Sequence, residues 1–169
     1  MSVHERPGRS NEWYTPPYVF QAMRVKFDRD MASPGANKVP WVPANVHSTR
    51  NSPSPWQGFC WLNPPFGGRN GLKPWLEEFV KHGNGVCLVP DRTSAPWWQF
   101  LAKNSELILF LSPKVKFVDS KGRLGKSPSN GITLHAIGPN GRKALKNASS
   151  LGWLAVSPEV QAALNGRQP

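Results

Sequence analysis

The sequence predicts a single small domain of the α/β class with a mostly parallel sheet. Three apolar runs, at residues 58–62, 85–90 and 105–111, are too short for buried helices and indicate buried strands. Two amphipathic stretches, residues 72–81 and 95–103, lie between them and indicate helices. The chain has 169 residues, of which 38% are hydrophobic, and this suits one domain with a moderate core.

The elements of the N-terminal third are short. Residues 1–10 are polar and predict a flexible arm ahead of a domain that spans residues 11–169. A Thr-Pro-Pro sequence followed by spaced apolar residues predicts a helix over residues 18–24. Alternating apolar and charged residues predict a strand over residues 25–31. Residues 34–57 are rich in Pro, Asn and Ser and are interpreted as an irregular loop insertion.

The C-terminal part follows the third apolar run. Residues 115–118 indicate a short extended segment, and the Lys-, Gly- and Ser-rich residues 119–130 indicate a second loop insertion. Residues 132–137 predict the last core strand. A basic tail follows and ends in a helix predicted over residues 158–164.

Composition narrows the class of function. The net charge is +11, from 21 Lys and Arg against 10 Asp and Glu, which favours nucleic acid as a partner over a basic surface without one. Cys60 and Cys87 lie inside apolar runs and the four histidines are scattered, so we predict reduced thiols and no metal. We find no membrane-length apolar run and no signal peptide, and we expect a cytoplasmic protein.

The stretch Asn63-Pro64-Pro65-Phe66 follows a predicted buried strand. Asn63 offers a side-chain carbonyl and Pro64 a backbone carbonyl without a competing N–H group, while Pro65 restricts the backbone further. Phe66 adds a flat apolar face. Such a loop can accept both hydrogens of a planar NH2 group and stack on the ring that carries it, as in adenine. The alternative is an ordinary turn that ends the strand.

Two further groups of residues are candidates for ligand binding. Trp13 and Tyr14 can pack against a flat ligand, and Thr15 and Pro16 begin a predicted helix whose N–H groups suit a carboxylate. The alternative for this group is plain helix capping.

Asp28 and Asp30 end a predicted strand, where a carboxylate can bind an amino group or ribose hydroxyls. Strand alternation puts both on one face, so at most one of them needs a function. The alternative is a solvated strand edge.

Four blocks occur in a fixed order: Trp13 to Pro16, Phe27 to Ser33, Trp61 to Phe66, and Leu88 to Thr93 followed by Trp97-Trp98. Together they resemble the phage-type DNA adenine-N6 methyltransferases, a family of small Dam-like enzymes of phages and prophages. The resemblance spans roughly residues 11–137. It implies a Rossmann-like methyltransferase fold that uses S-adenosylmethionine.

The resemblance also implies roles for residues. The catalytic residues would be Asn63, Pro64, Pro65 and Phe66. The cofactor-binding residues would be Trp13, Tyr14, Thr15, Pro16, Asp28, Asp30, Ala32, Ser33 and Asn63. On the substrate, Phe117 resembles the aromatic residue that sandwiches the flipped base. Apart from the resemblance, Arg92, Lys114 and Lys116 are predicted to contact the substrate, with Lys and Arg around residues 114–126 and 142–146 on its phosphates. The alternative for these basic residues is a solvated loop. One departure leaves the cofactor contacts open, because Met31-Ala32-Ser33-Pro34-Gly35 stands where methyltransferases in general have a glycine-rich turn.

The expected activity is methyl transfer from S-adenosylmethionine to the N6 of an adenine flipped out of duplex DNA. We expect a monomer or weak dimer, encoded by a phage or prophage and acting in the bacterial cytoplasm, in a restriction-modification context. The alternatives are a non-catalytic nucleic-acid-binding protein of the same fold and a methyltransferase for RNA adenine or for protein glutamine, whose amide is also a planar NH2 group. The sequence does not indicate a target site.

Overall fold

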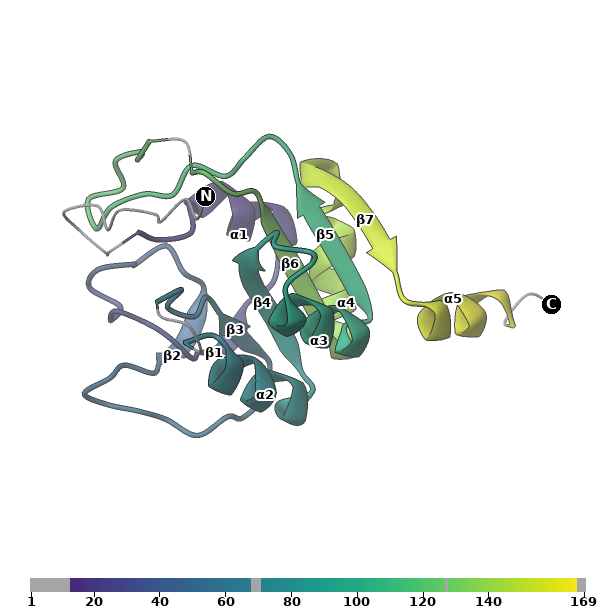
Figure 1. Ribbon diagram of the computed structural model, residues 1–169. Coiled ribbons are helices and arrows are strands. Elements are labelled where there is room, and N and C mark those ends of the chain that lie inside the picture. Colours follow the sequence, from purple (N-terminus) through teal and green to yellow (C-terminus); the bar gives the residue numbers. More distant parts are fainter. Residues whose placement is uncertain (1–12, 68–70, 127, 167–169) are drawn as a thin grey trace.

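A seven-stranded sheet forms the centre of the computed structural model, which describes residues 13–67, 71–126 and 128–166 (Figure 1). Its strands are β1 (Phe27–Asp30), β2 (Ala44–His47), β3 (Cys60–Leu62), β4 (Gly85–Pro90), β5 (Leu107–Leu111), β6 (Ile132–Ile137) and β7 (Gly152–Val156). The helices are α1 (Pro17–Met23), α2 (Lys73–His82), α3 (Pro96–Asn104), α4 (Gly138–Asn147) and α5 (Pro158–Asn165), with a 3-10 turn at Ser149–Leu151. The N-terminal arm predicted over residues 1–10 lies outside the described residues.

The strand order is β2-β1-β3-β4-β6-β5-β7. β2, β1, β3 and β4 are paired in parallel. β6 is antiparallel to both β4 and β5, and β7 at the edge is antiparallel to β5. The prediction of a mostly parallel sheet therefore holds for the half that contains β1 to β4, and the other half is antiparallel.

Helices cover both faces of the sheet. α1 and α4 contact each other on one face, and α2 and α3 contact each other on the opposite face (Figure 1). β4 shows how the sequence supports two layers, because Val86 and Leu88 belong to the core on one side while Cys87 and Val89 belong to the core on the other. A central strand buried on both faces needs a continuous apolar sequence, and Gly85–Pro90 has one.

Two regions differ from the sequence-based expectation. β2 lies inside residues 34–57, which were predicted to be irregular throughout. α4 and β7 occupy a tail for which only the final helix was predicted. Residues 115–118, predicted as a short extended segment, belong to no strand of the sheet, and Val118 makes isolated antiparallel bridges to Tyr14 and Leu124.

The topology creates a crevice between β1 and β3. From β1 the chain moves to β2 on one side, and then returns to place β3 on the other side of β1. In open α/β sheets the ligand binds outside the carboxyl ends of the strands at the point where the strand order reverses. Here that point lies between Asp30 at the end of β1 and Asn63 directly after β3.

Candidate functional site

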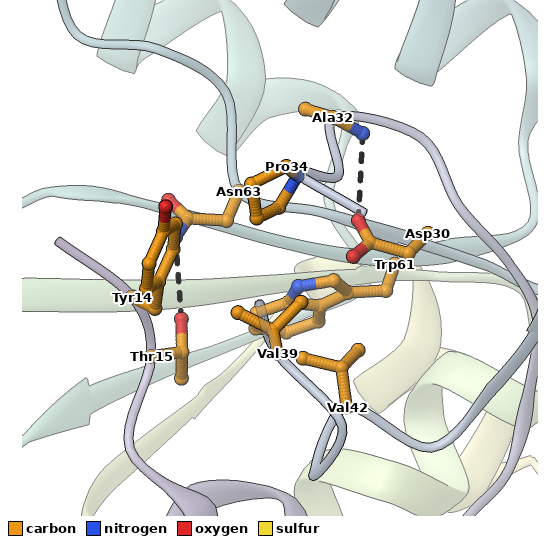
Figure 2. Close-up of a pocket in the computed structure, with 9 residues that line it drawn as sticks. All are labelled: Tyr14, Thr15, Asp30, Ala32, Pro34, Val39, Val42, Trp61 and Asn63. Carbon is orange, nitrogen blue, oxygen red and sulfur yellow. Dashed lines mark hydrogen bonds between the residues drawn. The ribbon is translucent and has the colours of Figure 1, made fainter. Parts of the chain in front are cut away.

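A pocket lies at this crevice, at the carboxyl ends of β1 and β3 (Figure 2). Its walls come from the segment before α1, the ends of the two strands and the loop that follows β1. The lining residues are Tyr14, Thr15, Asp30, Ala32, Pro34, Val39, Val42, Trp61 and Asn63. The pocket thus brings together five residues that were predicted from sequence: Tyr14, Thr15, Asp30, Ala32 and Asn63.

Asp30 is the acidic group of the pocket. Its side chain is buried, and the whole residue is 3% exposed. Its Oδ1 accepts a hydrogen bond from the Ala32 backbone N–H at 3.4 Å, and its Oδ2 lies 3.6 Å from Nδ1 of His47. An ionised carboxylate has about four acceptor positions, and these two contacts are long, so the buried group retains acceptor capacity for an amine or hydroxyl donor.

The loop after β1 is held by Ser33. Its Oγ contacts Nδ1 of His47 at 3.0 Å and accepts the Gly35 backbone N–H at 3.1 Å. Its backbone N–H donates to the carbonyl of Ser48. Ser33 does not line the pocket, and it acts by fixing the loop that places Ala32 and Pro34 there.

Asn63 and Thr15, which both line the pocket, are joined by a hydrogen bond (Figure 2). Nδ2 of Asn63 donates to Oγ1 of Thr15 at 3.3 Å. Thr15 is buried, and its backbone carbonyl accepts a hydrogen bond from Nε1 of Trp41 at 2.9 Å. With its NH2 group directed to Thr15, the amide of Asn63 has its carbonyl oxygen available for a ligand.

The predicted helix start is displaced by one residue. Pro16 is the N-cap of α1 and Pro17 begins the helix, and the cap makes no side-chain hydrogen bond. The expectation that Thr15 caps the helix is therefore wrong, because its hydroxyl accepts from Asn63 instead. Pro16 is buried beside the pocket wall and does not line it.

The Asn-Pro-Pro-Phe loop leaves the sheet directly after β3. Asn63 is half-buried and Pro64 is buried, whereas Pro65 is exposed. Phe66 is 43% exposed, so its ring face is accessible from outside the fold. The loop thus presents an anchored polar end at the pocket and an aromatic end toward solvent.

Apolar pocket residues were missed from sequence. Trp61 is 2% exposed and packs edge-on against Phe20, with ring centroids 4.9 Å apart. Its position in the block before Asn63 was the available signal. Val39 and Val42 come from the loop before β2, and neither lies in a recognisable motif. His47, which contacts both Asp30 and Ser33, was also missed because it lies on β2.

Besides Pro16 and Ser33, three further residues predicted to bind a ligand do not line the pocket. Asp28 stands nearer the start of β1, where its Oδ2 accepts the Phe59 backbone N–H at 2.7 Å. Trp13 packs against Gly125, at which a Cβ would lie 2.4 Å from the indole ring. The ring of Phe117 packs against the core rather than in the pocket.

The predicted basic contacts surround the same edge of the sheet. Lys114 and Lys116 are exposed in the segment after β5, and Nζ of Lys114 donates to the Ser129 carbonyl at 2.9 Å. Arg92 is exposed after β4 and lines a second, open hollow with Asp91, Thr93, Ser94, Ala95 and Asn130.

The described part of the chain contains neither a metal-binding cluster nor a membrane-spanning helix. Residues 13–67, 71–126 and 128–166 contain no group of three or more His, Cys, Asp and Glu side chains that could hold a metal ion. Within the same residues, no helix is both long enough and apolar enough to cross a membrane.

Comparison with known families places the chain. Residues 4–135 match the model of the family described as DNA N-6-adenine-methyltransferase (Dam). No match is found among curated proteins or among solved structures. The match covers most of the chain and includes every residue that lines the pocket. The chain therefore belongs to the DNA N-6-adenine-methyltransferase (Dam) family.

Proposed function

We propose that this protein transfers a methyl group from S-adenosylmethionine to the N6 of an adenine flipped out of duplex DNA. The observation that carries the proposal is the Asn63 amide, anchored by Thr15 in a pocket that the buried carboxylate of Asp30 also lines. Family membership supports adenine in DNA as the substrate. The net charge of +11 supports a polyanionic partner.

The strand order supports a Rossmann-like methyltransferase fold. β1 to β4 form a parallel unit whose strand order reverses at β1, with helices on both faces of the sheet. A pocket at that reversal is where such folds bind nucleotide-like ligands.

The chemistry of the residues that line the pocket suits S-adenosylmethionine. Asp30 is a buried carboxylate with acceptor capacity, which suits an amino group or ribose hydroxyls. Trp61 and Tyr14 supply aromatic surface, and Val39 and Val42 supply apolar surface for an adenine ring. When bound, the cofactor supplies an electrophilic methyl group on a sulfonium.

The Asn63-Pro64 pair would activate the substrate amine. The lone pair of the adenine N6 is delocalised into the ring, so the amine is a poor nucleophile. Oδ1 of Asn63 and the carbonyl of Pro64 would accept the two N6 hydrogens and favour a more tetrahedral nitrogen. The same acceptors would stabilise the positive charge that develops on N6. No strong base is needed before transfer, since the methylated nitrogen is acidic.

Phe66 would hold the flipped base by stacking. Its exposed ring lies three residues beyond Asn63, so one loop would hold both the amine and the ring of the adenine. Stacking of a base on an aromatic side chain contributes about 1–3 kcal/mol. That contribution offsets part of the cost of unstacking the adenine from the duplex.

The test is transfer of labelled methyl groups to duplex DNA, followed by detection of N6-methyladenine. We expect wild-type protein to methylate, and Asn63→Ala to reduce the rate by about 100-fold or more, as loss of one preorganised polar group does elsewhere. Asn140→Ala is the matched control, because Asn140 is exposed on α4 away from the pocket lining. Equal activity of Asn63→Ala and wild type would contradict the proposal.

The same assay separates the alternatives. Label on adenine-containing RNA but not on duplex DNA would indicate an RNA methyltransferase, and label on protein glutamine would indicate the third substrate. If calorimetry detects no binding of S-adenosylmethionine while the protein still binds duplex DNA, the protein is a non-catalytic DNA-binding member of the family.

A further inference from the structure

Leu124 exposes a large apolar side chain in a segment that is rich in basic residues. It is 68% exposed. It lies in the segment of residues 119–126, which we call the basic turn and which also carries Lys121, Arg123 and Lys126. A single exposed Leu needs no explanation by itself. Three observations distinguish Leu124: the hydrogen bonds that order its segment, its position beside the pocket wall and its charged neighbours.

The basic turn is rigidly built around Asp119. Oδ1 of Asp119 accepts the backbone N–H groups of Lys121 and Arg123, each at 2.9 Å. Its Oδ2 accepts Nε of Arg123 at 2.8 Å. These bonds, first among them that from the Arg123 backbone, lower the pKa of the Asp119 carboxyl. The ordered turn presents Leu124 in a fixed position, which lowers the entropic cost of using it in binding.

The basic turn is joined to the pocket wall. Tyr14, which lines the pocket, exchanges two backbone hydrogen bonds with Val118, at 2.8 and 2.9 Å. Val118 is bridged in turn to Leu124. These two bridges place the backbone of Leu124 across Val118 from the segment that carries Tyr14. Trp13 packs on Gly125 and closes the gap between the two segments.

The charge around Leu124 selects the partner. Residues 114–126 contain five basic residues against the single acidic Asp119. The guanidinium of Arg123 is engaged by Asp119, whereas Lys121 and Lys126, which flank Leu124 in sequence, are exposed. An apolar side chain with exposed lysines before and after it in sequence suits a nucleic-acid duplex, whose apolar interior lies between two phosphate backbones.

We propose that the basic turn enters duplex DNA and that Leu124 fills the space left by the flipped adenine, with Lys121 and Lys126 on the flanking phosphates. This inference rests on the proposed function. Apolar wedges such as Leu insert between base steps in other DNA-binding proteins, and they stabilise the unstacked duplex. The contribution of Leu124 is therefore confined to substrates in which the target base must be extruded.

The experiment compares Leu124→Ala with wild type on two duplexes, each of which contains a single adenine that the wild-type protein can methylate. In one duplex the adenine is paired with thymine, and in the other the opposite position is abasic. We expect Leu124→Ala to lower the methylation rate on the paired duplex by about tenfold or more. On the abasic duplex we expect rates within about twofold of wild type, because that adenine is already unpaired.

Two variants serve as controls. Leu124→Met retains apolar volume and should methylate the paired duplex like wild type. Lys121→Ala should lower the methylation rate by the same factor on both duplexes, because a phosphate contact does not depend on pairing of the adenine. Equal loss with Leu124→Ala on both duplexes, or no loss on either, would overturn the inference while leaving the proposed function intact. Absence of methylation by wild-type protein would remove both.

Discussion

Thr15 holds the side chain of Asn63, the proposed acceptor for the substrate amine, through one buried hydroxyl. It lies 48 positions before Asn63 in the chain, and its Oγ1 accepts the Nδ2 hydrogen bond that orients the amide. Because the Trp41 indole holds the Thr15 backbone carbonyl at 2.9 Å, the hydroxyl cannot drift with the segment before α1. Thr15 is a positioning residue in the proposed mechanism, since it acts on the substrate through Asn63.

Thr15→Val therefore has a specific expected effect. It retains the side-chain volume and removes the acceptor, so the fold is kept while the amide loses its orientation. Loss of one such hydrogen bond predicts a fall in kcat of roughly 3- to 10-fold. The KM for duplex DNA should remain unchanged, and Thr15→Ser should restore kcat. Steady-state kinetics of the three proteins provide the measurement. Equal kcat values for Thr15→Val and Thr15→Ser would show that the hydroxyl does not position Asn63.

At the scale of elements, α4 packs unusually close to β4. A Cβ at Gly141 would lie 2.6 Å from the carbonyl oxygen of Gly85 and 3.2 Å from the Cβ of Ala136. Gly85 of β4 is paired with Ile137, and Ala136 of β6 is paired with Val86, in the centre of the sheet. The backbone oxygen of Gly85 therefore cannot move aside easily. The absence of a side chain at Gly141 is what allows the helix to reach the sheet.

Gly141→Ala therefore tests two opposing effects. Helix propensity alone predicts a gain of about 1 kcal/mol for Gly to Ala in a helix interior. Overpacking against a fixed backbone costs about 1–3 kcal/mol. We expect the overpacking term to win and the free energy of unfolding to fall, as measured by urea denaturation. Asn140→Ala, at an exposed neighbouring position, should change it by less than about 0.5 kcal/mol. A stabilised Gly141→Ala would mean that α4 shifts freely on the sheet.

A buried histidine joins β6 to its neighbours. Nδ1 of His135 contacts Oγ of Ser105 at 3.0 Å, and its Nε2 contacts Oγ1 of Thr133 at 3.0 Å. Thr133 also accepts Nε1 of Trp98, which brings α3 into the same network. Burial lowers the pKa of His135 from 6.5 to about 3, so the imidazole is neutral in the folded protein.

The consequence is a stability that declines with acid. Below pH 6.5 the unfolded chain binds a proton at His135 that the folded chain does not, so unfolding is favoured as pH falls toward 3. The limiting slope is about 1.4 kcal/mol per pH unit. We expect a falling free energy of unfolding between pH 7 and pH 5, where Asp and Glu contribute little. His135→Gln should flatten this slope, and the same slope in both proteins would contradict the assignment.

Three strands that were predicted correctly share a physical property. β3, β4 and β5 have apolar runs because they are covered on both faces, and that burial is written into the local sequence. β2 is an edge strand with no fully buried residue, so Ala44–His47 carries no such signal. α4 begins with Gly138-Pro139, a pair typical of turns, and its packing depends on contacts that local sequence does not reveal.

The candidate site divides in the same way. Asn63 and Asp30 follow strands and could be predicted, because carboxyl ends of parallel strands are where α/β folds bind ligands. The Thr15–Asn63 bond and the His47–Asp30 contact could not, because they depend on register and on which segments the fold brings together. Asp28 was named with Asp30 because both lie at the end of the predicted strand, and in the structure it accepts the Phe59 backbone N–H instead.

On the scale of the whole molecule, unpaired positive charge is unevenly distributed along the chain. The acidic residues of α2 are paired within the helix, as Lys73 with Glu77 and Lys81 with Glu78. Glu106 is paired with Arg142 of α4. Residues 114–126 keep an excess of positive charge beside the pocket. The field of the protein therefore favours a polyanion at the edge of the sheet where Asn63 and Phe66 lie.

This distribution predicts how DNA binding depends on salt. If the four lysines of the 114–126 segment each neutralise one phosphate, the slope of log K against log salt is about −3.6, and binding weakens about 150-fold between 50 and 200 mM salt. Fluorescence anisotropy with a labelled duplex measures the slope. Replacing both Lys121 and Lys126 by Ala should reduce its magnitude by about 2, whereas Lys81→Ala, on the paired surface of α2, should leave it unchanged. A slope near zero, or one reduced equally by Lys81→Ala, would place the DNA on another face of the protein.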